Sequence, residues 1–267
     1  RIGIIGDWGT GFASACGGRT PAKDVLTNMM DKNIDYLIHL GDTYYSGTPQ
    51  FKNMLLPPSY LCPGEEVDNL INCWPSLPDK HSFTLNSNHD MFCGGVGYFS
   101  DLVTSGTDPL SPFGHQNATS YFLLSNSKYQ LFGLDSSYFA TPPHFLGGTL
   151  GGTSNTKQSL FIRDNYDSSK TQIVFTHHPA LNFDGDGCTD LWDEVGTAYD
   201  ENTVGTDNEV SPDYWYFGHN HNGVVYANSG RSSSARNRTN ARLIGHSAIP
   251  HGFPRALANA DDIADTE

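Results

Sequence analysis

The sequence predicts an α/β fold with one main domain, residues 1–255, and an acidic C-terminal tail, residues 256–267. Three observations favour this architecture. Short apolar strands alternate with helices or long loops, a chain of 267 residues can bury one sizeable core, and neither an internal repeat nor a Pro/Ser-rich linker divides it.

The N-terminal half is predicted to begin with a strand and an amphipathic helix. The apolar run Ile2–Gly6 forms the strand. In "TPAKDVLTNMMDK", Thr20 can act as the N-cap and Pro21 suits the first helical turn, while one face carries Val25, Leu26, Met29 and Met30.

The remaining elements follow from short apolar segments separated by polar turns. A cysteine-containing insertion, residues 46–80, interrupts the domain, and a helix is predicted over Lys157–Tyr166. Further strands are predicted at Tyr36–Leu40, Ser82–Leu85, Tyr121–Leu124, Tyr129–Leu134, Gln172–Thr176, Tyr214–Phe217, Val224–Ala227 and Arg242–Gly245.

The charge of the chain restricts its partners. The net charge is −14, with only 15 Lys and Arg residues, so nucleic acid and anionic lipid are disfavoured. No apolar run approaches the length of a membrane span. An anionic substrate would therefore need a different attractor, and a metal ion is the obvious one. The oligomeric state does not follow from the sequence.

Cysteines and glycosylation sequons favour an exported protein, in a secreted, periplasmic or lysosome-like compartment. Five cysteines form no CxxC pair, and Cys62 could close the insertion with Cys73 as a disulfide. The sequons "NAT" and "NRT" begin at Asn117 and Asn237.

Polar clusters follow several of the predicted strands. In open α/β sheets the strand ends converge on one edge, so these segments would deliver their side chains to one crevice. The set contains carboxylate, amide and imidazole groups but no thiolate, which suits hard or borderline metal ions at a catalytic site. It is too large for one ion. The clusters contain Asp7, Asp42, Asn88, His89, His177, His219 and His221.

The ordered motifs GD, GDxxY, NHD, the histidine of "THHP" and GHxH resemble those of the calcineurin-like metallophosphoesterases, and most closely the purple acid phosphatase branch. They extend from residue 7 to residue 221. The resemblance implies a four-layer α-β-β-α sandwich of two mixed sheets flanked by helices, in the single-domain form of the family.

The resemblance also implies the ligands of two metal ions. The first ion would bind Asp7, Tyr45 and His221, the second would bind Asn88, His177 and His219, and Asp42 would bridge them.

Tyr45 is preferred over Tyr44 because the family tyrosine stands three residues after the bridging aspartate; Tyr44 is assigned to packing or pocket lining. A phenolate ligand requires a strongly acidic ion such as Fe(III). The second ion would be Zn(II), Fe(II) or Mn(II), and together the ions would attract a phosphate dianion.

The family chemistry is hydrolysis of phosphate esters by a metal-bound hydroxide that attacks phosphorus. His89 is predicted to protonate the leaving alkoxide or contact a phosphoryl oxygen, or alternatively to support Asp90. Ser87 replaces the glycine that usually precedes the NHD motif, which a negative φ would permit.

The leading functional hypothesis is an acid phosphomonoesterase with a small phosphate-ester substrate. A phosphodiesterase for cyclic nucleotides, nucleotide sugars or phospholipid head groups would use the same metal core, and the loops 46–80, 101–118 and 137–156 would decide between them. A degenerate metal-binding protein is the third alternative.

Overall fold

The structure is a computed structural model, and it describes part of the chain. The described residues are 1–8, 21–44, 47, 66–104, 111–153, 155–185, 187–228, 234–245, 247 and 260–262. Among them, no helix is long and apolar enough to span a bilayer.

The smaller sheet has three strands in the order β1-β2-β3, and both pairings are parallel. The register pairs the last residue of each strand with its neighbour, Ile5 with His39 and His39 with Thr84. The chain therefore leaves all three strands at the same edge. The strands are β1 (Ile2–Ile5), β2 (Tyr36–His39) and β3 (Ser82–Thr84).

The larger sheet is mixed and has seven strands, in the order β10-β8-β9-β7-β6-β5-β4. Its centre, from β5 to β9, is parallel, whereas β4, β8 and β10 run antiparallel to their neighbours. The strands are β4 (Phe122–Ser125), β5 (Tyr129–Gly133), β6 (Thr171–Thr176), β7 (Tyr214–Phe217), β8 (Gly223–Tyr226), β9 (Asn240–Ile244) and β10 (Ala260–Asp262).

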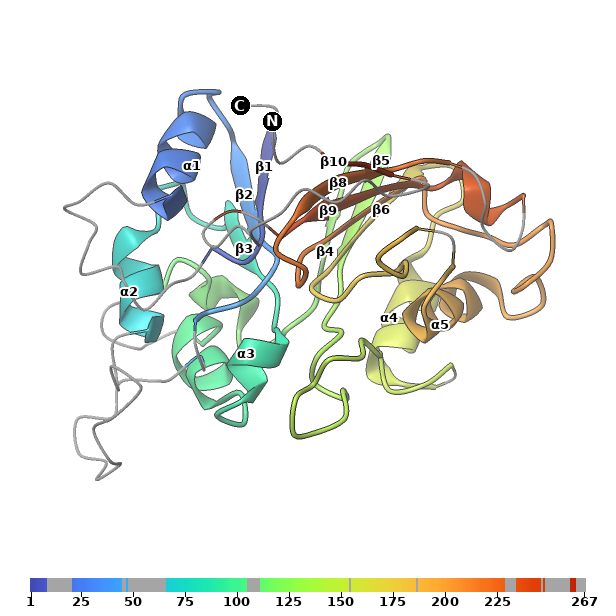
Figure 1. Cartoon of the computed structure of the whole chain (residues 1–267), viewed down its shortest axis with the longest axis horizontal. Coiled ribbons are helices and arrows are strands. Elements are labelled where there is room, and N and C mark those ends of the chain that lie inside the picture. Colours follow the sequence, from blue (N-terminus) through green and yellow to red (C-terminus); the bar gives the residue numbers. More distant parts are fainter. Residues whose placement is uncertain are drawn as a thin grey trace.

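The two sheets face each other and helices cover their outer faces, as Figure 1 shows. Helices α1 (Pro21–Met30), α2 (Glu66–Cys73) and α3 (Asn88–Met91) lie beside the smaller sheet. Helices α4 (Lys157–Asn165) and α5 (Asp190–Asp200) lie beside the larger one. The predicted four-layer sandwich is confirmed, with the difference that all pairings in the described three-stranded sheet are parallel.

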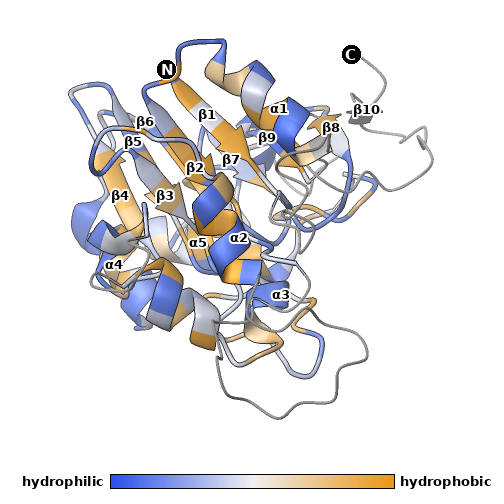
Figure 2. Cartoon of the chain, turned by 90° about the vertical axis from the view of Figure 1, so that its left-hand side faces the viewer, coloured by the Kyte–Doolittle hydropathy of each residue, from blue (hydrophilic) through white to orange (hydrophobic). Residues whose placement is uncertain are grey.

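Apolar side chains fill each of the three interfaces between layers. Ile38 and Phe83 from the smaller sheet meet Leu131 and Phe175 from the larger one. A second cluster lies between the larger sheet and its helices, and a third lies under α1 and α2, where Figure 2 shows hydrophobic strands of the smaller sheet next to these helices. Burial of these side chains is the main stabilising contribution to the fold.

Most predicted elements match observed ones within one or two residues, but α2, α3 and α5 were not predicted. The acidic tail, predicted to be solvated, contributes Ala260–Asp262 as β10, which pairs with β8.

Candidate metal centre

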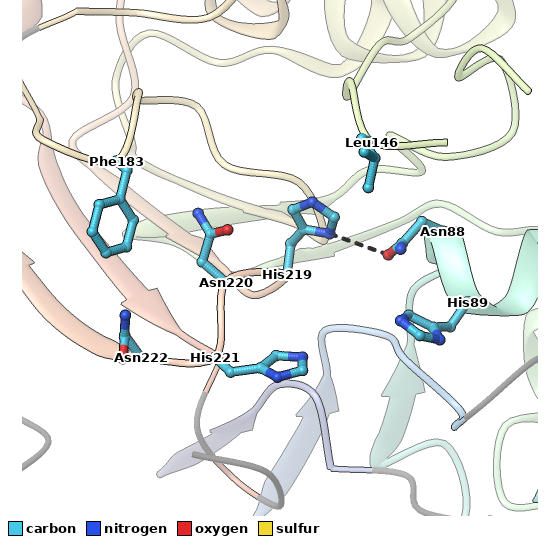
Figure 3. A pocket seen from close by; sticks show the side chains of 8 residues that line it. All are labelled: Asn88, His89, Leu146, Phe183, His219, Asn220, His221 and Asn222. Carbon is cyan, nitrogen blue, oxygen red and sulfur yellow. Dashed lines mark hydrogen bonds between the residues drawn. The ribbon is translucent and has the colours of Figure 1, made fainter. Parts of the chain in front are cut away.

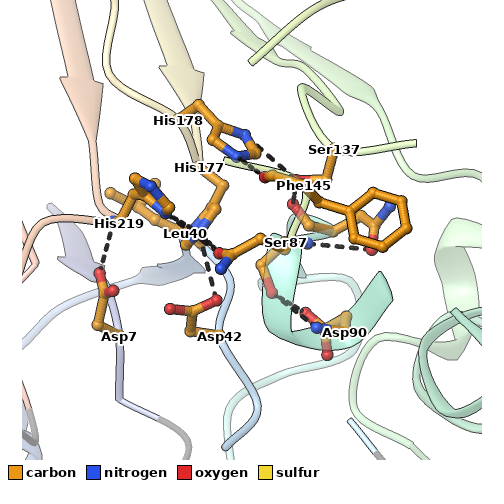
Figure 4. Close-up of polar contacts among 12 residues, drawn as sticks. Asp7, Leu40, Asp42, Ser87, Asp90, Ser137, Phe145, His177, His178 and His219 are labelled. Atoms are coloured by element: carbon orange, nitrogen blue, oxygen red, sulfur yellow. Dashed lines mark hydrogen bonds and ion pairs between the residues drawn. The ribbon is translucent and has the colours of Figure 1, made fainter. Parts of the chain in front are cut away.

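Six of the predicted metal ligands converge where strands of both sheets end. Asp7 and Asp42 follow β1 and β2, and Asn88 opens α3 just after β3. From the larger sheet, His177 follows β6, and the "GHNH" segment follows β7. Figure 4 shows the resulting cluster, in which side chains from the two sheets point toward one another. The six ligands are Asp7, Asp42, Asn88, His177, His219 and His221.

Unusual backbone conformations aim these side chains. Asp7, Asp42 and His219 have positive φ values of 54°, 69° and 71°. Non-glycine residues rarely adopt this region, and such residues concentrate at functional sites. The glycine of "GHNH" is also required, because a Cβ at Gly218 would lie 2.5 Å from Asp7 Oδ2. The turns are therefore shaped around the carboxylates.

Two carboxylates and one imidazole form the centre of the cluster. Asp7, Asp42 and His177 are at most 1% exposed, and each offers one ligand atom within 4.8 Å of the others. Within the described part of the chain, neither carboxylate forms an ion pair with Lys or Arg. Two adjacent buried anions without a fixed positive charge are costly. A metal cation would compensate them.

The second group of predicted ligands presents several acceptor atoms to one another. His177 Nδ1 lies 2.9 Å from the Leu40 carbonyl oxygen, which can only accept, so Nδ1 carries the proton. The opposite nitrogen, Nε2, then has a lone pair, yet it lies 2.7 Å from Asn88 Oδ1 and 3.2 Å from Asp42 Oδ1. His219 Nδ1 lies 3.1 Å from the same Asn88 oxygen. A cation among these acceptors would satisfy all of them.

The electrostatics agree with this interpretation. Burial and the charge of Asp42 raise the pKa of Asp7 well above its usual value. Burial alone would also raise the pKa of Asp42, but the nearby His177 and other imidazoles lower it below its usual range. Burial lowers the pKa of His177 to about 3 and also lowers that of His219. Neutral imidazoles beside an ionised carboxylate are the protonation states that metal ligation needs.

Tyr44 reaches further into the cluster than the sequence indicated. Its side chain is buried, and its hydroxyl lies within hydrogen-bond distance of both Asp42 Oδ2, at 2.9 Å, and Asp7 Oδ1, at 3.1 Å. It also contacts His221 Nε2, which lies 3.4 Å from Asp7 Oδ1. The Tyr44 phenol therefore faces the predicted ligands of the first metal. Tyr45, the predicted phenolate ligand, lies outside the described residues.

His89 lies on the open side of the cluster. A cavity of about 410 Å³ is lined by His89, by three of the predicted ligands and by four further residues (Figure 3). The His89 ring packs edge-on against Tyr44, with centroids 4.6 Å apart. This position is compatible with contact with a bound substrate, and the catalytic role of His89 stays a prediction. The lining residues are Asn88, His89, Leu146, Phe183, His219, Asn220, His221 and Asn222.

Ser87 has a structural role that the sequence did not reveal. Its φ of −137° is negative, which is the condition for a serine to replace the usual glycine at this position. The Ser87 hydroxyl caps α3 by accepting from Asp90 N at 3.1 Å. The Ser87 hydroxyl donates to Asp90 Oδ2 at 2.5 Å. This N-cap and the side-chain contact between Ser87 and Asp90 therefore fix the first turn of α3, which carries Asn88 and His89.

Replacing Asp90 with Asn is expected to flatten the pH dependence of stability in the metal-free protein. Burial raises the pKa of Asp90 to about 8, from an ordinary value of 3.8. Stability from protonated Asp90 is thus fully present below about pH 4 and is lost as the pH rises through about 8. Thermal melts should show a larger loss between these values for wild type than for Asp90→Asn. Asp164→Asn, at an exposed position, is the control for removal of one carboxylate. Equal losses of thermal stability in wild type and Asp90→Asn would contradict this assignment.

Other predictions concern residues for which the structure gives partial information. Cys62 lies outside the described residues, so its pairing with Cys73 stays a prediction. Within the part of the chain that the structure describes, Cys93 and Cys188 form no disulfide. Asn117 is exposed in a turn, and its glycosylation, like that of Asn237 and the export of the chain, stays a prediction.

Comparison with protein families gives a match over most of the chain. A family model described as calcineurin-like phosphoesterase matches residues 1–223. The chain belongs to this family. All six predicted ligands that converge in this calcineurin-like phosphoesterase lie within the matched region. No match was found among curated protein sequences.

Solved structures of similar fold include a purple acid phosphatase, PhoD and an anchor protein. Purple acid phosphatase PPD1 from yellow lupin (Lupinus luteus) seeds has a TM-score of 0.53 and 15% identity, over 99% of this chain and 47% of that chain. PhoD has a TM-score of 0.55 and 12% identity, over 93% of this chain and 56% of that chain. GAP50, the anchor in the inner membrane complex of Plasmodium, has a TM-score of 0.53 and 10% identity, over 97% of this chain and 76% of that chain.

At these identities the likeness shows the fold alone. The phosphoesterase chain corresponds to about half the length of the lupin enzyme and of PhoD. The family and the purple acid phosphatase fold together imply a dinuclear metal centre, and the cluster of Asp7, Asp42 and His177 is a candidate site for it.

Proposed function

We propose that this calcineurin-like phosphoesterase is a two-metal acid phosphomonoesterase. The first metal would be held by Asp7, His221 and a tyrosine phenol. Asn88, His177 and His219 would hold the second, with Asp42 shared between them. The first ion is proposed to be Fe(III) and the second Zn(II), Fe(II) or Mn(II).

One observation carries this proposal most directly. Asp7, Asp42 and His177 place ligand atoms within 4.8 Å of one another in a buried cluster without a compensating Lys or Arg among the described residues. Carboxylate, amide and imidazole acceptor atoms that face each other in a buried cluster fit a pair of cations better than a packed structural core.

The bound ions would supply Lewis-acid stabilisation of the phosphoryl oxygens and an activated water. The chain itself would contribute three actions. Leu40 fixes the His177 tautomer, with its carbonyl oxygen accepting from Nδ1. Asp7 accepts from the His219 amide at 3.0 Å, which holds the "GHNH" turn in place. His89 would donate a proton to the leaving alkoxide from the open side of the cavity.

The proposal is tested by assaying metal-loaded protein at about pH 5 with phenyl phosphate and with diphenyl phosphate. The monoester should turn over faster than the diester by at least about tenfold, because a dianionic phosphoryl group gains more from two cations. Preferential turnover of the diester would instead support a phosphodiesterase. Absence of turnover with two metals bound would support the degenerate metal-binding alternative.

The two adjacent tyrosines provide a matched pair of variants. The contacts of the Tyr44 hydroxyl with Asp7 and Asp42 favour Tyr44 as the phenol that binds the first metal. If that metal is Fe(III), the loaded protein should show a visible tyrosinate-to-iron band. Tyr44→Phe is expected to abolish the band, and Tyr45→Phe to retain it. The opposite result would restore the assignment to Tyr45, as predicted from the sequence.

A further inference from the structure

Apolar side chains surround the open side of the candidate metal centre. Leu146 and Phe183 line the cavity from two different loops, as Figure 3 shows. Leu146 is 62% exposed and Phe92, beside His89, is 41% exposed. Together with Phe145 these residues form what we term the apolar rim: Phe92, Phe145, Leu146 and Phe183.

Ring contacts connect the apolar rim to the proposed catalytic histidine. The His89 ring lies 4.8 Å from the Phe92 ring, measured between centroids, and Phe92 lies 6.4 Å from Phe145. Leu146 follows Phe145 directly and reaches the cavity. Leu146 and the neighbouring rings therefore give the mouth of the cavity one apolar side next to His89, whereas six of the eight lining residues are Asn or His. A proton donor at His89 would direct the departing alcohol to this apolar side.

His178 anchors the loop that carries Phe145 and Leu146. Its Nε2 donates to the Phe145 carbonyl oxygen at 2.6 Å, and its Nδ1 accepts from the Ser136 hydroxyl at 3.0 Å. Both contacts are compatible with a neutral imidazole. His178 is fully buried, and a Cβ at Gly148 would lie 2.4 Å from His178 Cβ. The loop is thus held closely against the centre, so the apolar rim is a preformed surface.

The cavity offers little to a charged leaving group. None of its eight described lining residues is Lys, Arg, Asp or Glu. The whole chain carries a net charge of −14. A leaving group with further phosphates or carboxylates would lose hydration and meet a repulsive field without a cationic partner. An uncharged apolar group would instead bury surface against the apolar rim.

We propose that the apolar rim is a leaving-group subsite, and that the substrates are phosphate monoesters of uncharged aryl or other apolar alcohols. This inference rests on the proposed phosphomonoesterase function. Phosphate would occupy the metal end of the cavity, and the apolar group would lie against Leu146 and Phe92. Ester cleavage would break the P–O bond, with water supplying the hydroxyl of phosphate and the alcohol leaving protonated.

The test compares kcat/KM for 2-naphthyl phosphate and phenyl phosphate, whose leaving groups have similar acidity but different apolar area. Metal-loaded wild type should prefer the naphthyl ester by roughly three- to tenfold. Leu146→Asn should bring this ratio close to one, whereas Leu146→Phe should maintain or raise it. Ile2→Asn is the control and should leave the ratio unchanged, because Ile2 is also an exposed aliphatic residue, 40% exposed, and lies at the end of β1 away from Asp7.

The outcomes separate this inference from the function on which it depends. A wild-type ratio of one, or a ratio unchanged in both Leu146 variants, would overturn the subsite while hydrolysis of phenyl phosphate upheld the phosphomonoesterase. If the metal-loaded protein hydrolysed neither ester, the proposed function and the subsite would both fail.

Discussion

Replacing Asp42 with Asn is expected to abolish binding of at least one metal and to lower kcat/KM for phenyl phosphate by at least about a thousandfold. Asp42 lies at the centre of the cluster, and one of its oxygens, Oδ1, is buried without a hydrogen-bond partner among the described residues. Loss of its charge would remove several kcal/mol of metal-dependent stabilisation of the reacting phosphoryl group. Metal analysis and steady-state kinetics on the same preparation would measure both effects.

The same variant should stabilise the metal-free protein. Burial and the charge of Asp42 raise the pKa of Asp7, so the two carboxylates oppose each other when no cation is bound. Asp42→Asn removes that repulsion, and the metal-free melting temperature near pH 7 should therefore rise. Exposed Asp164→Asn serves as the control for loss of one negative charge. A variant that bound two metals, or melted lower than metal-free wild type, would contradict the role given to Asp42.

The second large effect is expected for His89→Ala. A positioned general acid contributes about 10²–10⁴-fold to rate, and the contribution is greatest when the leaving group is a poor one. His89 lines the cavity beside Tyr44. The variant should lose at least about a hundredfold in kcat on phenyl phosphate but much less on 2,4-dinitrophenyl phosphate, whose leaving group needs no proton.

His81→Ala provides the control, because His81 precedes β3 and stacks on Tyr36, away from the carboxyl ends of the strands. It should leave both rates near those of wild type. Equal losses of His89→Ala on the two esters would show that His89 binds the phosphoryl group or supports the structure, and does not act as a proton donor.

Much of the fold could be predicted because its strands are short apolar runs bounded by polar turns. The helix α5 was not predicted, although Trp192, Val195 and Tyr199 are buried at helical spacing and Thr189 occupies the N-cap position before them. Acidic residues and Gly196 weaken that pattern, and packing against the larger sheet compensates. Residues 260–262 were predicted as a solvated tail because local composition does not reveal an available edge on β8.

The grouping of the candidate ligands could be predicted from the sequence, but the choice of tyrosine could not. Parallel register brings the ends of β1, β2 and β3 to one edge, so ligands that follow strands could be grouped before any coordinates were known. The choice between Tyr44 and Tyr45 could not be made in this way. Asp42 has a positive φ, which residue counting does not reveal, and the Tyr44 hydroxyl that follows it lies at Asp7 and Asp42.

The account is tested most directly by metal content combined with X-ray absorption on protein loaded with iron and zinc. Two ions per chain, with a metal–metal distance of roughly 3.5–4 Å, are expected for wild type. The metal–metal signal should disappear in Asp42→Asn. A wild-type protein that bound one ion or none, or that bound two ions too far apart to share Asp42, would contradict the two-metal centre.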